Sequence, residues 1–201
     1  AAGEKGAILR WEQFTDEGLS QYVEGRDIPS AYSVSLLSPY LAWGDISVRA
    51  IWHSAKGLND AEVYMHSSID AFLRQLIWRE FAYHQLIHFP TMLHLPLRER
   101  FKAFPWQGSD EELAKWQSGL TGYPLVDAGM RELRETGAIH NRVRMVVASF
   151  LVKHLLISWV DGSNWFKGAL VDYDAASNAM GWQWVAGTGI DAAPYFRIFN
   201  P

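Results

Sequence analysis

Apolar residues recur along this chain mainly at the spacing of α-helices. The clearest stretch is 67–89, where Ile69, Phe72 and Leu76 stand three or four positions apart. That spacing places them on one face of a helix, so this face is expected to be buried and the opposite face to meet solvent. Pro90 cannot continue a helix, and we expect this helix to end before it.

The segment 141–159 is apolar almost all round, which predicts one buried central helix with the core of the fold around it. A helix over 164–170 is expected next, followed by a loop rich in small residues up to Gly189. Three more helices are predicted from Pro, Gly and capping residues at their ends: 41–43 after Ser38-Pro39 and before Gly44, 48–56 before Gly57, and 125–136 between Pro124 and Gly137.

Strand signals are scarce. No run of alternating β-branched residues occurs, and nothing alternates between strand and helix as a parallel sheet requires. Gln107-Gly108-Ser109-Asp110 has the composition of a linker, but nothing marks it as a domain boundary. The pattern therefore predicts an all-α fold and a single domain over residues 1–201.

Composition narrows the class of protein. Hydrophobic residues make up 49% of the 201 positions and charged residues 20%, which excludes a disordered or collagen-like chain. The absence of cysteine excludes disulfides and thiolate-bound metals and fits a reducing compartment such as the cytoplasm. A net charge of −4 does not indicate a generic basic nucleic-acid binder, although one face can still be basic. Ten tryptophans are the unusual feature, because large aromatic surfaces bind ligands, transfer electrons or fill cores.

The apolar runs of the chain and its first residues indicate where the protein resides. The apolar run 145–152 is too short for a bilayer that needs about 20 residues, so no membrane span is expected. The first residues lack the apolar stretch of a signal peptide. They also lack an initiating Met, which suggests a fragment or a processed chain.

Two short motifs carry little information. Residues 187–192 spell G-x-G-x-x-A, but a dinucleotide loop needs a preceding strand and a following helix, so a plain glycine loop is favoured. Glu80, His84 and His88 share one helix face, yet the H-E-x-x-H order of a zinc helix is absent. Solvated histidines explain this spacing better, and no metal is expected.

Three polar segments admit both a binding and a structural reading. Ser35-Leu36-Leu37-Ser38-Pro39 offers hydroxyls and backbone N–H groups that hold phosphate at a helix start, but it is also an ordinary helix cap. The segments 140–145 and 172–178 bring Asn, Arg and Asp side chains next to Trp182 and Trp184. Such groups suit a flat heteroaromatic cofactor or a flipped base, and equally a capped turn beside core tryptophans.

Taken together, these segments resemble the flavin-binding domain of the DNA photolyase and cryptochrome family. Six motifs between Tyr22 and Pro201 carry the resemblance, in the family's order and spacing: Tyr22 with Arg26-Asp27; Ser35 to Leu41; Leu76 to Phe81; Thr121 to Ala128; His140 to Met145; and Gly181 to Trp184 with Asp191 to Pro201. Any one of them is moderate support, and six in series are specific.

The resemblance implies a role for each matching position. It implies FAD as cofactor, held by Tyr22, Val34, Ser35, Leu36, Leu37, Ser38, Asn141, Arg144, Asp172, Tyr173, Asp174 and Asn178. It implies an electron relay through Trp106, Trp159 and Trp182. It implies a pocket for an extruded DNA lesion lined by Gln75, Trp78, Arg79, Asn141, Arg142, Met145, Trp184 and Arg197. Asn178 is expected beside the reactive ring nitrogen of the flavin.

Some positions depart from the family pattern. Val34 stands where Thr is frequent, and Gln75 stands where many dimer photolyases have Glu. Gln can still hydrogen-bond a pyrimidine edge, but it cannot take or shield charge as a carboxylate can. His140-Asn141, in place of His-His, favours the cyclobutane dimer over the 6-4 lesion. The family's N-terminal antenna domain and its C-terminal tail are missing from this sequence, as expected of a catalytic-domain fragment.

The implied function is light-driven, FAD-dependent splitting of cyclobutane pyrimidine dimers in UV-damaged DNA, by a monomer. The alternative is a blue-light photosensor of the cryptochrome type with the same flavin and tryptophans. A helical flavin-binding domain that has lost repair is a third reading, favoured only by Gln75.

Overall fold

The computed structural model describes residues 2–31, 33–61, 65–190 and 198–201. In these ranges the regular structure is helical and no strand occurs, as the sequence pattern predicts. The chain divides into two compact units, Ala1–Phe81 and Ala82–Pro201, called here the N-terminal and C-terminal units. Among the described residues, none of the helices combines the length and the apolar composition needed to cross a bilayer.

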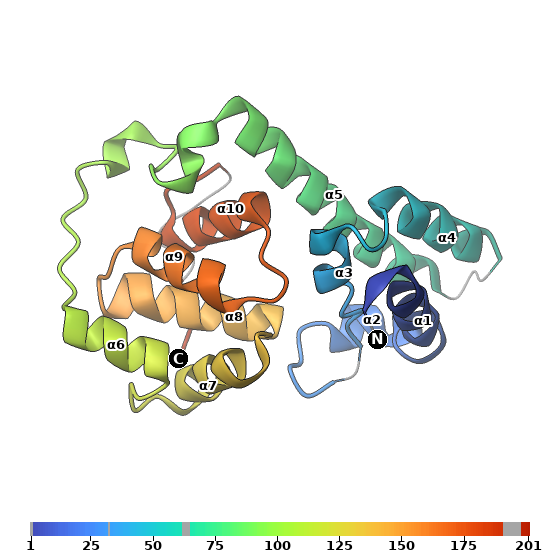
Figure 1. The fold of residues 1–201 in the computed structure, drawn as a ribbon, viewed down its shortest axis with the longest axis horizontal. Helices are drawn as coiled ribbons and strands as arrows, with labels where there is room; N and C mark the ends of the chain where they lie inside the picture. Colours follow the sequence, from blue (N-terminus) through green and yellow to red (C-terminus); the bar gives the residue numbers. More distant parts are fainter. Residues whose placement is uncertain (1, 32, 62–64, 191–197) are drawn as a thin grey trace. The chain divides into compact units, whose positions relative to one another are not determined.

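The N-terminal unit has a core of aromatic and aliphatic side chains. Its helices are α1 (Gly3–Glu17), η1 (Leu19–Gln21), α2 (Tyr22–Gly25), α3 (Ser38–Trp43), α4 (Val48–Ala61) and the first part of α5 (His66–His88) (Figure 1). Phe14, Tyr22 and Phe72 meet in the core, with Phe72 5.3 Å from Phe14 and 5.8 Å from Tyr22 between ring centres. These contacts join α1, α2 and α5.

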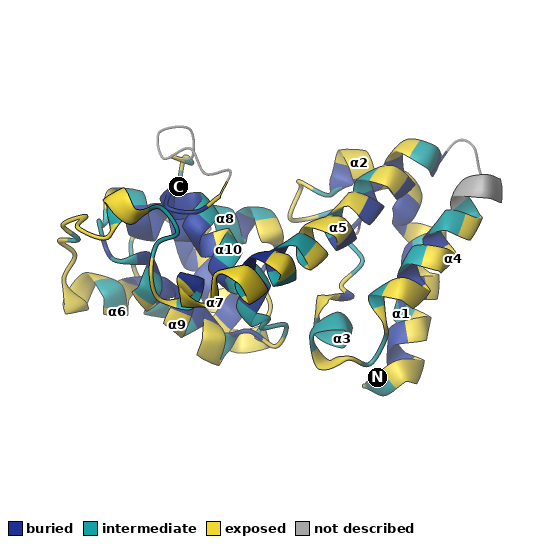
Figure 2. Cartoon of the chain, turned by 90° about the horizontal axis from the view of Figure 1, so that it is seen from above, coloured by how far each residue is buried: buried dark blue, intermediate teal, exposed yellow. Residues whose placement is uncertain are grey.

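The C-terminal unit carries the larger core. Its elements are the end of α5, η3 (Pro90–Leu93), η4 (Glu99–Phe101), α6 (Asp110–Ser118), α7 (Pro124–Thr136), α8 (Asn141–Ser149), the π-helical turn η5 (Phe150–His154), α9 (Trp159–Ala169) and α10 (Ala175–Ala186). Trp116, Phe166 and Trp182 pack with ring centres 5.0 to 6.2 Å apart. Buried positions gather along α8 and α10 in Figure 2.

Gly162 shows how closely α9 approaches α10. A Cβ atom placed on Gly162 would lie 2.2 Å from a ring carbon of Trp182 and 2.6 Å from Leu151. No side chain fits in that space, because real Cβ contacts are longer. The helices therefore meet through glycine, and the indole of Trp182 fills the gap.

Several predicted helix ends are confirmed. Helix α5 ends at His88, before Pro90, and α7 starts at Pro124. Gly44 and Gly137 follow α3 and α7 in the left-handed conformation that ends a helix, with φ of 77° and 71°. The described part of the glycine motif, Gly187 to Ile190, follows helix α10 and not a strand, with Gly187 as its left-handed cap.

Other predictions about elements were wrong. The segment 141–159 is not one helix, because it breaks at residues 155–158 between η5 and α9. Helix α4 continues through Gly57 to Ala61, since one glycine lowers helix stability by only about 1 kcal/mol. The expected loop after residue 170 contains α10, whose N-terminus Asp174 caps with its side chain. Ser109 and Asp110 do not belong to a linker: a capping box between Ser109 and Glu112 starts α6.

Candidate functional site

The segment 34–38 of the N-terminal unit is held by an arginine from α1. The Nε of Arg10 donates to the Ser35 carbonyl at 2.7 Å, and its Nη2 donates to the Val34 carbonyl at 3.3 Å. Leu36 takes a left-handed φ of 53° and is exposed, whereas Leu37 is buried. The Leu37 N–H donates to Ser35 Oγ at 3.4 Å, and the exposed Ser38 is the first residue of α3. The backbone is thus fixed in a turn that begins a helix.

Tyr22 is a core residue of the N-terminal unit. Its ring lies edge-on to Phe14 and Phe72, both 5.8 Å away. Burial raises the pKa of the Tyr22 hydroxyl above its ordinary value, although Arg26, 5.2 Å from the ring centre, acts in the opposite direction. Tyr22 remains a neutral phenol over the physiological range, able to donate a hydrogen bond without carrying charge.

Helix α5 carries three of the residues assigned to lesion binding. Gln75 Nε2 donates to the Ala71 carbonyl one turn earlier, at 3.1 Å. Trp78 is 46% exposed and lies edge-on to Phe81, 5.7 Å away. Arg79 pairs with Glu80 at 2.9 Å and donates to the Leu41 carbonyl at 3.4 Å. Trp78 therefore keeps a free aromatic surface, while Arg79 is tied to α3.

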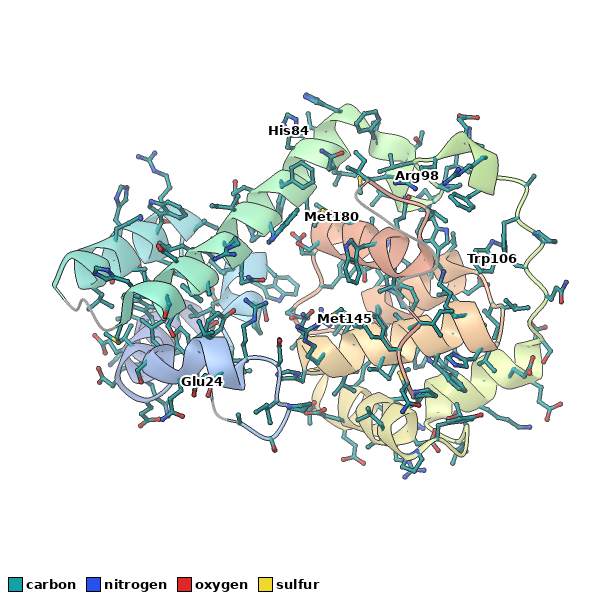
Figure 3. All side chains as sticks on the ribbon, turned by 180° about the vertical axis from the view of Figure 1, so that it is seen from behind. Glu24, His84, Arg98, Trp106, Met145 and Met180 are labelled. Atoms are coloured by element: carbon teal, nitrogen blue, oxygen red, sulfur yellow. The ribbon has the colours of Figure 1, made fainter. Side chains whose placement is uncertain are left out.

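The start of α8 gathers polar groups around a methionine. Asn141 Nδ2 and Arg142 Nη1 lie 3.9 and 3.8 Å from Met145 Sδ. His140 caps the helix, because its Nδ1 accepts the Arg142 N–H at 3.2 Å. Figure 3 labels Met145 on α8 and Met180 on α10. The structure thus brings three of the assigned lesion residues, Asn141, Arg142 and Met145, together.

Arg144 and Asp172 form an ion pair in the C-terminal unit. Arg144 Nη2 lies 3.2 Å from both carboxylate oxygens and 3.4 Å from the Ile139 carbonyl. The Arg144 Nε is buried, and the described residues offer it no hydrogen-bond partner. A buried donor without an acceptor costs roughly 1–3 kcal/mol. This N–H therefore fits a ligand that brings a hydrogen-bond acceptor, as a flavin does.

Asp174 and Asn178 have partners that orient them. One Asp174 oxygen accepts the Ser177 N–H at 2.7 Å, and the other accepts a short hydrogen bond from the Tyr83 hydroxyl. Asn178 Nδ2 donates to the carbonyl and to the Oγ of Ser163, at 3.2 and 2.9 Å. The donor side of the Asn178 amide is thus committed to α9, which leaves its oxygen as the group to present to a ligand. Neighbouring Tyr173 is half-buried, and burial raises its pKa.

The assigned tryptophans differ in depth. Trp182 and Trp159 are buried, and Trp106 and Trp184 are half-buried against the same core. Trp182 lies edge-on to Phe166, 5.0 Å away. Trp106 lies on the segment before α6 (Figure 3). Its ring centre is 4.6 Å from that of Phe104. Among the three tryptophans assigned to the relay, Trp159 and Trp182 are thus about equally buried, and Trp106 is the most exposed.

The assigned residues fall into two groups. Tyr22, the segment 34–38 and the α5 residues 75–79 belong to the N-terminal unit, and the others belong to the C-terminal unit. Arg197 lies outside the described residues. In the part of the chain that the structure describes, no three His, Asp or Glu side chains gather to hold a metal ion. His84 and His88 lie side by side on α5, with their rings 4.3 Å apart.

Four supporting residues escaped the sequence analysis: Arg10, Tyr83, Ser163 and Gln183. The Gln183 side chain is fully buried and binds the carbonyls of Met92 and Leu95 and the N–H of Leu97. Gln183 stands inside the 181–184 motif, which was the one available signal. The other three lie far along the chain from the residues they hold, and no local pattern marks them.

Comparison with known proteins gives consistent results. A sequence model described as the FAD binding domain of DNA photolyase matches residues 72–201. The deoxyribodipyrimidine photo-lyase of Agrobacterium fabrum is 52% identical over 199 residues, which cover 99% of this chain and 41% of that protein. A deoxyribodipyrimidine photo-lyase of Thermus thermophilus is 46% identical over 99% of this chain and 46% of its own length. The chain spans less than half the length of these curated relatives.

Solved structures of photolyases and of a cryptochrome also resemble this chain closely. A class III photolyase from Agrobacterium tumefaciens superposes with a TM-score of 0.94 at 52% identity, over 99% of this chain and 41% of that one. The cryptochrome of Synechocystis sp. PCC6803 superposes with a TM-score of 0.90 at 38% identity, with the same coverage of each chain. An archaeal photolyase from Sulfolobus tokodaii, described with two FAD molecules, gives 0.85 at 36% identity, over 100% of this chain and 42% of that one.

Proposed function

The chain belongs to the DNA photolyase and cryptochrome family, and from this membership we propose that it binds FAD and splits cyclobutane pyrimidine dimers in UV-damaged DNA under light. The observation that carries the proposal is the pair of Arg144 with Asp172, in which the buried Nε of Arg144 lacks an acceptor among the described residues. A flavin carries carbonyl oxygens and ring nitrogens that can accept this N–H.

The residues of the chain bind and orient the cofactor. FAD, when bound, supplies the light absorption and the electron that splits the dimer. Arg144 and Asp172 offer a donor and an acceptor, and Asn178 presents its amide oxygen because Ser163 holds its nitrogen. The fixed turn at residues 34–38 offers backbone N–H groups for the phosphates.

The lesion is bound by stacking and by charge. A dimer must leave the DNA stack to reach the active site, and a damaged base pair costs least to open. Trp78 offers an exposed aromatic face, and Met145 provides an apolar surface between Asn141 and Arg142. Arg142 can also contact the DNA backbone.

We further propose that the protein acts as a monomer in the cytoplasm, which size-exclusion chromatography and cell fractionation would test.

Repair of a defined substrate tests the proposal. FAD-loaded protein with reduced flavin is mixed with an oligonucleotide that contains one thymine dimer, and is exposed to blue light or kept dark. We expect the dimer to be converted back to thymines only in the light, which restores absorbance at the thymine band. Absence of light-dependent repair, with flavin stoichiometrically bound, would contradict the proposal.

The Arg144→Ala variant tests the cofactor assignment. We expect it to lose most of its flavin during purification, because the arginine that faces Asp172 is removed and a buried carboxylate is left without this partner. The ratio of flavin to protein absorbance measures the loss. Arg134→Ala, on the exposed face of α7, is the control and should keep its flavin. Equal flavin content in both variants would argue against the role of Arg144.

A cryptochrome-like photosensor is the less favoured alternative, because the identity to the Synechocystis cryptochrome is 38% and that to the photo-lyase of Agrobacterium fabrum is 52%. The two functions differ in the dark. A repair enzyme binds dimer-containing DNA more tightly than undamaged DNA, and a photosensor without a lesion pocket does not. Fluorescence anisotropy with the two oligonucleotides separates the candidates.

A further inference from the structure

Two irregular features occur together where α8 fails to continue into α9: a π-helical turn and a left-handed leucine. The turn η5 closes a wide helical loop, since the Leu155 N–H donates to the Phe150 carbonyl at 3.1 Å. Leu156 then adopts a left-handed φ of 54°, and besides Leu36 it is the one non-glycine residue with positive φ in the part of the chain that the structure describes. Strained and π-helical segments are found preferentially at functional positions.

The strained residue turns its carbonyl toward a distant segment. The Leu156 oxygen accepts the N–H of Gln107 at 3.0 Å and the N–H of Gly108 at 3.4 Å. Two donors from consecutive residues thus converge on one oxygen, about 50 residues away in sequence. The left-handed conformation of Leu156 is held in place by these two bonds and by the Ile157 N–H, which donates to the Leu151 carbonyl at 3.1 Å.

At Gly108 the chain approaches residues 155–157 too closely for any residue that has a Cβ atom. A Cβ atom at this position would lie 1.9 Å from Ile157 Cγ1 and 3.0 Å from the Leu155 carbonyl oxygen. Ile157 is buried in the core, so it cannot move away without loss of packing. The requirement for glycine is steric, because the φ of Gly108 is not in the left-handed range. We call Gln107, Gly108, Leu156 and Ile157 the backbone clamp.

The clamp joins the two segments that carry Trp106 and Trp159. Trp106 immediately precedes Gln107, and Trp159 begins α9 three residues after Leu156. Ser158 fixes that helix start, because its Oγ accepts the Val160 N–H at 3.2 Å. Trp106 is half-buried on the segment before α6, outside any helix. Its own N–H donates locally to the Phe104 carbonyl at 3.0 Å, and the clamp links this segment to residues 155–157.

We propose that the backbone clamp sets the separation of Trp106 and Trp159 and thereby the rate of electron transfer between them. This inference rests on the proposed function. One electron passes from the Trp106 indole to oxidised Trp159, so that Trp159 is reduced and Trp106 is oxidised. A dissolved thiol then reduces Trp106, and the flavin is the final acceptor of the electron that the chain relays. Leu156 and Gly108 are positioning residues, because they act through the two indoles.

Two variants of Leu156 form a matched pair for the test. Leu156→Val disfavours the left-handed φ, because a β-branched residue is strained there. Leu156→Asn removes the same side chain but tolerates that φ. Gly108→Ala is an independent second variant that opens the clamp from the other side. Hydrogen–deuterium exchange of the Gln107 and Gly108 amides measures the clamp itself and does not require flavin.

Photoreduction of oxidised flavin in the FAD-loaded protein with excess thiol measures the relay. We expect Leu156→Val and Gly108→Ala to exchange these amides faster and to slow photoreduction several-fold, and Leu156→Asn to behave as wild type. Dimer repair by chemically reduced protein should stay unchanged in all three, because it does not use the relay. Flavin content and melting temperature report whether each variant is folded.

Three outcomes would overturn the inference: unchanged photoreduction after loss of amide protection, amide protection retained in both Leu156→Val and Gly108→Ala, or equal loss of photoreduction and repair, which would reveal a merely structural role. Failure of the proposed function gives a different result, namely no dimer repair by the wild-type protein. The comparison of photoreduction rates would still stand in that case.

Discussion

Asn178 shows how much of a site depends on neighbours that a sequence does not reveal. The resemblance identified Asn178, and the structure adds that both acceptor atoms of Ser163 bind its amide nitrogen. Asp174 likewise serves as helix cap and as acceptor for Tyr83. The contacts with Ser163 and Tyr83 span 15 and 91 residues along the chain, beyond the reach of motif spacing. The resemblance could therefore name candidate residues, but it could not give the orientation of their polar atoms.

The Trp182→Phe variant tests the residue that we propose as the innermost member of the electron relay. We expect it to abolish photoreduction of oxidised flavin, because phenylalanine is far harder to oxidise than tryptophan, and to leave repair by reduced flavin largely intact. Photoreduction under blue light and dimer repair after chemical reduction are the two measurements.

Trp116→Phe is the matched control. Trp116 is an equally buried neighbour of Trp182, 6.2 Å away, with no assigned role in electron transfer. Its loss should lower stability, because the bond from its Nε1 to the Val147 carbonyl disappears, but should spare photoreduction. Loss of repair and photoreduction together in Trp182→Phe would mean that this side chain is only structural.

Asp127 makes stability depend on pH. It is buried at the start of α7 and accepts hydrogen bonds from Thr121 and Gly122 at 2.6 to 2.9 Å. Burial alone would raise the pKa of this carboxyl, but the hydrogen bonds and nearby Arg131 outweigh it and lower the pKa. Because the folded pKa lies below the unfolded one, the stabilisation is complete above the ordinary value of about 4 and is lost as pH falls through the folded pKa.

We therefore expect Asp127→Asn to lower the free energy of unfolding at pH 7 by about 1–3 kcal/mol, and the difference from wild type to shrink below about pH 4. Urea denaturation at both pH values measures this. Glu135→Gln, on the exposed side of the same helix, is the control and should change little. A difference that persisted undiminished at low pH would argue against the charged form of Asp127 as the source.

At the level of elements, the sequence predicted helix ends best where a proline or a left-handed glycine marks them, whereas Gly57, whose φ is not left-handed, did not end α4. Pro90, Pro124 and Gly137 act locally, through a missing N–H or a left-handed backbone, so tertiary contacts do not alter them. Helix α10 was missed because its alanines and glycine resemble a loop, although Asp174 is a recognisable cap. The break after η5 had no local signal, since leucine rarely adopts the conformation of Leu156.

The contact of α9 with α10 gives a test at this scale. Gly162→Ala should lower the free energy of unfolding by about 1–3 kcal/mol, because the added methyl group overlaps the Trp182 ring. Gly168→Ala in the same helix has no atom within 4 Å and should leave stability equal or slightly raised. Thermal melts of the two variants measure the contrast. Equal melting temperatures would show that the helices can separate at no cost.

For the whole molecule, a net charge of −4 is compatible with DNA binding only through local contacts. The affinity for DNA should therefore fall with salt according to the few arginines that meet phosphate. We expect Arg142→Ala to weaken binding of dimer-containing and undamaged strands alike and to reduce the salt slope by about one. Anisotropy titrations at several salt concentrations measure the slope, and an unchanged slope would exclude a phosphate contact by Arg142.

The hydrogen bonds between Ser163 and Asn178 also constrain which residues can replace Asn178. Because the Asn178 nitrogen donates to the Ser163 carbonyl oxygen, a carboxylate oxygen in its place would lie against the partial negative charge of that carbonyl. A protonated acid at position 178 keeps a donor for this carbonyl, whereas an ionised acid loses it and can accept only from the Ser163 hydroxyl. The carbonyl of Ser163 thereby favours an amide at this position, and replacing the amide by an acid comes at the least cost together with a change in α9 or with uptake of a proton.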